Sequence, residues 1–163
     1  MRLFVEKEYP VSLPQQSVGQ AGRIIGWVIS VFITLCAFGF YYAHQAWSTG
    51  FFTASFTTGL AVLLYVSVLY LAVNSTAKLL TNRKSAVITV ELIGAFLTGI
   101  ATLALFIVFP FNCAHVGDVL PTPLQPLLGW VTNDIGKIAY GLAVLGSIVA
   151  IIADSARLVT ARD

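Results

Sequence analysis

Residues 24–77 read IIGWVISVFITLCAFGFYYAHQAWSTGFFTASFTTGLAVLLYVSVLYLAVNSTA, without a single Asp, Glu, Lys or Arg. A membrane-spanning helix needs about 20 mostly apolar residues, because it rises about 1.5 Å per residue through a hydrocarbon core of about 30 Å. This stretch therefore has room for two such helices. Residues 43–55 divide it with a mixture of polar and aromatic side chains, which is typical of a membrane interface.

The whole chain is likewise rich in hydrophobic residues and poor in charged ones. Of its 163 residues, 58% are hydrophobic and 10% are charged, and the mean hydropathy is +0.88. This composition excludes a water-soluble fold and indicates a chain surrounded by lipid. Two cysteines are too few for a disulfide scaffold, and a formal net charge of +2 gives no basic surface for phosphates, which excludes nucleic acid as a partner.

Four segments are long and apolar enough to cross a membrane, and we expect an all-α, integral membrane four-helix bundle. The expected spans are residues 24–42, 56–77, 85–110 and 135–156. A single membrane domain would cover residues 24–158, between an extended N-terminal segment (1–23) and a C-terminal tail (159–163). The loop between the middle two spans is short enough to force an antiparallel hairpin.

The basic residues predict the orientation of the chain. Eight of the nine Lys and Arg side chains precede the first span, join the second to the third, or follow the fourth, and only Lys137 belongs to the other side. Cationic segments resist translocation, so we expect both termini and the central loop to face the cytoplasm, or the matrix or stroma of an organelle. The membrane would be the plasma membrane or an organelle inner membrane.

Small residues recur along the fourth expected span at alternating steps of three and four. Helices in lipid associate through close packing of small residues, so this seam predicts that span four lies at the centre of the bundle, against spans one and three. Gly26 and Ser30 belong to a shorter counterpart in span one. The seam residues of span four are Gly136, Ala139, Ala143, Gly146, Ala150 and Ala153. The alternative is that Gly and Ala are simply common in membrane helices.

Glu91 is the most informative ionisable residue, because a charge at the centre of a span costs at least ~2.5 kcal/mol and usually faces a partner. We expect Asn74 and Asp154 at a similar depth. The favoured interpretation is structural: Glu91 hydrogen-bonds Asn74 or pairs with a cation, and fixes the register of the helices. The alternatives are a proton or cation relay and a lipid head-group site between basic side chains. The basic residues at this rim are Arg23, Lys78, Arg83, Lys84 and Arg157.

The two histidines, His44 and His115, are expected at the opposite interface, near Cys113. They lack metal-ligand spacing, so hydrogen-bonding anchors are favoured over a metal or haem site, and no cofactor or metal is expected. The chain contains no nucleophile elbow, glycine-rich phosphate loop or metalloprotease helix, which predicts a protein that is not an enzyme. The proline-rich segment 111–134 should lie along the interface, anchored by Trp130, or dock on another protein.

The layout resembles the MARVEL-type membrane proteins, which have four spans and cytoplasmic termini. The similarity rests on Arg23-Ile-Ile-Gly-Trp27 at the start of the first span, Glu91-Leu-Ile-Gly-Ala-Phe in the third, and Cys113 just beyond it. It covers the span layout and these few residues, and the proline-rich outer segment departs from the family pattern. The resemblance implies a role in membrane organisation and no active site.

These observations predict a non-enzymatic integral membrane protein that acts by helix packing. It would be a membrane organiser or a small accessory subunit of a larger respiratory, photosynthetic or ATPase assembly. Its partners would be lipids and other transmembrane proteins or further copies of itself. The alternative is a small oligomeric transporter or channel with a proton or cation site around Glu91, followed by a redox enzyme that uses His44 and His115.

Overall fold

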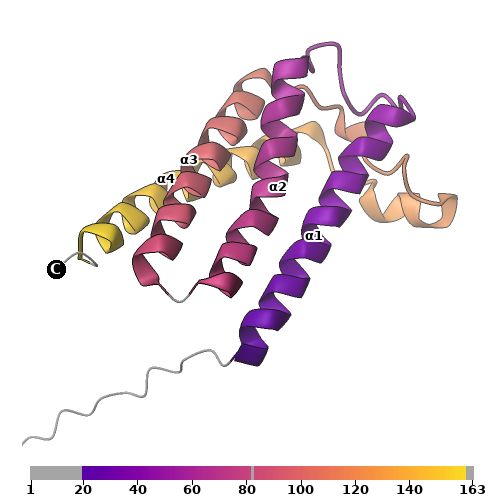
Figure 1. Cartoon of the computed structure of the whole chain (residues 1–163). Coiled ribbons are helices and arrows are strands. Elements are labelled where there is room, and N and C mark those ends of the chain that lie inside the picture. Colours follow the sequence, from indigo (N-terminus) through magenta and orange to yellow (C-terminus); the bar gives the residue numbers. More distant parts are fainter. Residues whose placement is uncertain (1–19, 82, 161–163) are drawn as a thin grey trace, which may run out of the picture.

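The computed structural model describes residues 20–81 and 83–160, so most of the predicted N-terminal segment and C-terminal tail lies outside the described residues. Within these ranges the regular elements are helices (Figure 1). The long helices are α1 (Gln20–Ala46), α2 (Thr58–Leu80), α3 (Lys84–Val108) and α4 (Asn133–Thr160), and the short 3-10 helices are η1 (Cys113–His115) and η2 (Thr122–Leu128).

Each of the four long helices is long and apolar enough to cross a membrane. Each also lies within a few residues of a span expected from the sequence, which confirms the number and position of the apolar helices. The chain is therefore all-helical and compatible with an integral membrane location.

Local side-chain chemistry explains where two of these helices begin and end. The Thr57 hydroxyl accepts the N–H of Leu60 and caps the start of α2. Helix α3 ends at Phe109, which adopts the left-handed conformation with φ of 40°, and its N–H donates to the Leu105 carbonyl. Pro110 follows and cannot continue the helix, so the chain turns away at this point.

The long helices contact one another in chain order: α1 with α2, α2 with α3, and α3 with α4 (Figure 1). Among the described residues, no Cα atom of α1 lies within 8 Å of one in α4. The helices therefore form an open row rather than a closed bundle. The prediction that span four lies at the centre, against spans one and three, is wrong, because α4 ends the row and has α3 as its neighbour among the long helices.

The face of α4 that packs on α3 is only partly the predicted seam. A Cβ placed on Gly136 would lie 2.9 Å from Phe109, and the buried Ser147 faces Gly99. The other predicted seam residues that remain exposed are Ala139, Ala143, Gly146 and Ala153, while Ala150 is half-buried. No heavy atom lies within 4 Å of a Cβ placed on Gly146. The chain's own helices thus leave most of the small-residue face open.

Aromatic side chains form the core at the loop end, which we define as the end with the α1–α2 and α3–α4 connections. Phe51 and Phe111 are buried, with ring centroids 5.3 Å apart. Tyr140 of α4 stacks on Phe111 at 5.2 Å. The backbone N–H of Asn112 donates to the Phe51 carbonyl at 2.7 Å, which ties the two connections together.

The proline-rich segment keeps apolar side chains exposed at this end. Leu127 and Trp130 are 65% and 64% exposed, and the indole N–H of Trp130 donates to the Leu127 carbonyl at 2.8 Å. Figure 1 shows η2 set to one side of the long helices. Its expected place along the interface or against another protein stays a prediction.

Replacing Gly94 with Ala should destabilise the α2–α3 contact, because the added Cβ would lie 2.4 Å from Cε1 of Tyr70. The Tyr70 ring is held by its hydroxyl, which donates to the Val90 carbonyl at 2.8 Å. We expect Gly94→Ala to lower the free energy of unfolding by about 1–3 kcal/mol, measured by denaturant unfolding in detergent. Gly26→Ala is the control, because it meets no heavy atom within 4 Å, and equal losses in both variants would contradict the contact.

Candidate functional site

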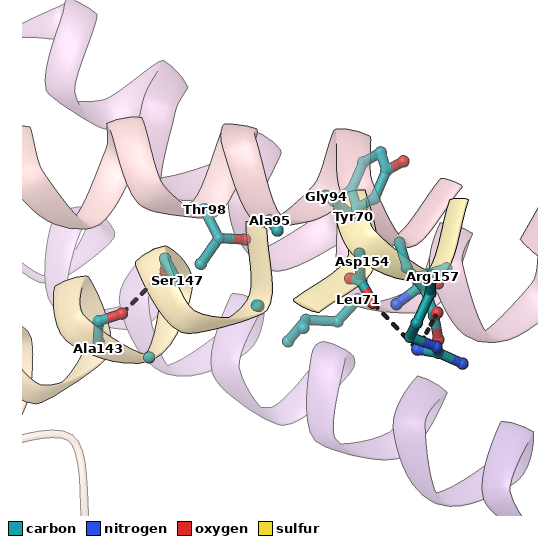
Figure 2. A pocket seen from close by; sticks show the side chains of 13 residues that line it. Tyr70, Leu71, Gly94, Ala95, Thr98, Ala143, Ser147, Asp154 and Arg157 are labelled. Atoms are coloured by element: carbon teal, nitrogen blue, oxygen red, sulfur yellow. Dashed lines mark hydrogen bonds and ion pairs between the residues drawn. The ribbon is translucent and has the colours of Figure 1, made fainter. Parts of the chain in front are cut away.

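Glu91 lies on α3 between cations from both neighbouring helices. Its Oε1 is 2.6 Å from Nζ of Lys78 on α2, and its Oε2 is 3.3 Å from Nη1 of Arg157 on α4. The same Arg157 nitrogen pairs with Asp154 at 3.0 Å, a contact drawn in Figure 2. The side chains of Glu91 and Asp154 are only 16% and 12% exposed. This cluster joins α2, α3 and α4 at one level.

Asn74 lies at a similar depth, but it is not the partner of Glu91. Its Oδ1 is buried and accepts no hydrogen bond within the described part of the chain. Both carboxylate oxygens of Glu91 are instead held by cations. This geometry matches the structural interpretation, in which a buried carboxylate fixes the relative positions of helices.

A groove of about 390 Å³ runs between α2, α3 and α4, beyond the ion cluster (Figure 2). Its charged lining residues are confined to the end with Glu91, Asp154 and Arg157. Farther along, the polar lining consists of the Thr98 and Ser147 hydroxyls, and Ser147 donates to the Ala143 carbonyl at 2.9 Å. The small residues that line this groove are Gly94, Ala95, Ala143, Gly146 and Ala150.

Arg23 connects the start of α1 to the end of α2. Its Nη2 donates to the carbonyls of Lys78, Leu79 and Thr81, the last two at 2.8 and 3.3 Å. The last carbonyls of a helix have no partner within the helix and carry its partial negative charge, so a guanidinium is well suited to cap them. One turn along α1, the indole N–H of Trp27 donates to the hydroxyl oxygen of Thr76 on α2 at 2.9 Å.

Cations from all four long helices line a cavity of about 550 Å³ at what we call the basic end. These residues are Arg23 of α1, Lys78 of α2, Lys84 of α3 and Arg157 of α4. They are four of the five basic residues singled out in the sequence. The fifth, Arg83, has an exposed side chain and does not line the cavity. We refer to this space as the basic cavity.

The two histidines each hold a connection at the loop end. His44 is buried, with its Nδ1 2.6 Å from Oγ1 of Thr49. His115 is exposed, with its Nδ1 2.8 Å from Oδ2 of Asp118. Within residues 20–81 and 83–160, no three His, Cys, Asp or Glu side chains gather in a way that could hold a metal ion.

Searches against protein-family models, curated proteins and solved structures find no match to this chain. The resemblance to MARVEL-type proteins therefore stays an expectation that rests on the span layout and the residues named for it. Function must be inferred from the geometry of the chain itself.

Replacing Glu91 with Gln should cost about 1–3 kcal/mol of unfolding free energy, because Lys78 and Arg157 lose a half-buried counter-charge. The measurement is denaturant unfolding in detergent. Asp118→Asn is the matched control, since the His115–Asp118 pair is 42% and 43% exposed and such pairs contribute about 0–1 kcal/mol. A smaller loss in Glu91→Gln than in the control would refute the structural role.

The Cys113 thiol should react slowly in the folded protein. Burial raises its pKa, so less thiolate is present at neutral pH than in a free cysteine. In a Cys36→Ser background, we expect iodoacetamide to alkylate folded Cys113 more slowly than the denatured chain, with a rate that rises only at more alkaline pH. Mass spectrometry measures the rates, and equal values for folded and denatured chains would be inconsistent with a buried thiol.

Proposed function

We propose that this chain is a non-enzymatic integral membrane protein that acts by helix packing, as a membrane organiser or as a small accessory subunit of a larger membrane complex. Its termini face the cytoplasm or the matching organelle compartment, in the plasma membrane or an organelle inner membrane. The distribution of Lys and Arg supports this orientation. A relationship to MARVEL-type proteins belongs to the same proposal, and the span layout supports it.

The open small-residue face of α4 is the observation that carries this proposal. Gly and Ala at steps of three and four let the backbone of a second helix approach closely, and this contact drives association in lipid. In this chain the face borders the groove between α2, α3 and α4, and a Cβ placed on Gly146 would meet no heavy atom of another residue's side chain or of a neighbouring helix within 4 Å. A helix from another protein or from a second copy of this chain would pack on this face of α4.

The alternative function, a transporter or channel around Glu91, has less support. Both Glu91 oxygens are paired with cations, and beyond this cluster the described lining of the adjoining groove has the Asn74 amide and several hydroxyls but no further Asp, Glu, Lys, Arg or His side chain. Proton and cation pathways generally need a series of ionisable groups or coordinating oxygens across the membrane. The geometry around Glu91 supports a joint between helices better than it supports a path.

Gly146→Leu tests the proposal, because a Cβ there meets no heavy atom within 4 Å and the leucine side chain would cover the small-residue face. We expect the wild-type chain, extracted in mild detergent, to carry a fixed number of partner chains or further copies. The variant should lose them while its unfolding midpoint stays unchanged. Native mass spectrometry gives the stoichiometry and separates foreign chains from second copies.

Ala156→Leu is the control, since Ala156 is also exposed on α4 but lies outside the seam. It should keep the wild-type stoichiometry. A wild-type chain that is always alone, or a Gly146→Leu variant that keeps its partners, would show that this face is not a helix-packing site.

A further inference from the structure

The basic cavity contains a cation with no counter-charge among the described residues. Lys78 and Arg157 share the carboxylates of Glu91 and Asp154, whereas Lys84 makes no ion pair with the described residues. Helix α3 also begins at Lys84 without a side-chain cap. The cavity therefore favours an anion, which would add the missing negative charge among these cations.

One hydroxyl group of the cavity suits the same anion. The hydroxyl oxygen of Thr81 accepts a hydrogen bond from the backbone N–H of Arg83. The proton of this hydroxyl therefore remains to be donated to a ligand in the cavity. Charged and hydroxyl donors from separate helices around one space match the several acceptor oxygens of a phosphate. A carboxylate, with two oxygens, would use fewer of them.

An unfilled groove with a mixed apolar and polar lining adjoins this cavity. It has a volume of about 460 Å³, lies between α1 and α2, and shares Arg23 and Lys78 with the basic cavity. Trp27 and Leu71 line it beside Ser30, Asn74 and Ser75, and no heavy atom lies within 4 Å of a Cβ placed on Gly26. The cations at one end suit a phospholipid head group, and the apolar surfaces of Trp27 and Leu71 offer contacts to an acyl chain.

We propose that an anionic phospholipid binds with its phosphate in the basic cavity and one acyl chain in the α1–α2 groove. The head group contacts residues of all four long helices, including α1 and α4, which do not approach each other directly. The lipid therefore closes the open row at the basic end. Gly146 lines neither of these two spaces, so the Gly146→Leu variant tests the helix partner without filling the lipid site.

Lys84→Gln tests the head-group contact, and Arg83→Gln is its matched control. The two residues are adjacent and exposed and lose the same charge, but only Lys84 lines the cavity. Native mass spectrometry of the full chain in neutral detergent, titrated with phosphatidylglycerol or phosphatidylcholine, measures lipid binding. We expect preference for phosphatidylglycerol, an affinity about five-fold lower in Lys84→Gln, and little change in Arg83→Gln.

Gly26→Leu tests the acyl-chain contact, because the new side chain would occupy the α1–α2 groove. Gly39→Leu is its control, since Gly39 also meets no heavy atom within 4 Å but does not line the groove. We expect Gly26→Leu to lose long-chain phosphatidylglycerol while its unfolding midpoint in detergent alone is unchanged. Gly39→Leu should bind the lipid like the wild type.

Three outcomes would overturn the proposal. Equal losses in Lys84→Gln and Arg83→Gln would indicate diffuse attraction to a basic surface. Equal binding of phosphatidylcholine would remove the role of the cations. Displacement of the lipid by millimolar inorganic phosphate, with no effect of Gly26→Leu, would assign the cavity to a soluble anion. The number of protein chains in the same spectra reports separately on the helix partner.

Discussion

The pairing of Glu91 constrains the rest of the structure. It is the single acidic residue of α3, and in the proposed membrane location an unpaired charge would cost at least ~2.5 kcal/mol. The neighbouring helices must therefore bring cations to its level, and Lys78 from α2 and Arg157 from α4 do so from opposite sides. This requirement sets the register of three helices at once, because a shift of one turn in α2 or α4 would move its cation by about 5.4 Å.

The two ends of the molecule are held by different forces. At the loop end, the rings of Phe51, Phe111 and Tyr140 pack into a core that fixes the backbone connections. At the basic end, ion pairs and the Arg23 cap on α2 hold the helices while cavities remain between them. The basic end combines four cations with two cavities that share Arg23 and Lys78, which is why the lipid contact is proposed there.

The sequence predicts the parts of this fold that depend on local composition. Span length follows from hydrophobicity and helix rise, and the depth of Glu91 follows from its distance to Lys84, so both can be derived without a structure. The face of α4 that packs on α3 cannot be derived in this way. Successive residues of a helix are rotated by about 100°, so small residues alone do not determine which side of the helix meets its neighbour. The contacts with α3 and the residue after it decide this face: Phe109 fits over Gly136, and Gly99 leaves room for Ser147. The convergence of Arg23, Lys84 and Arg157 on one cavity likewise depends on tertiary packing.

An open row of helices is stable in lipid for a reason that does not apply in water. In water, exposed apolar side chains on α3 and α4, such as Ile107 at 72% and Val149 at 65%, would drive aggregation. Lipid tails are as apolar as these side chains, so exposure costs only the difference between packing against protein and packing against lipid. A small-residue face can then remain uncovered without unfolding the chain. A helix or a lipid can therefore bind without rearrangement of the fold. The strength of association then depends on how closely that helix or lipid packs against the chain.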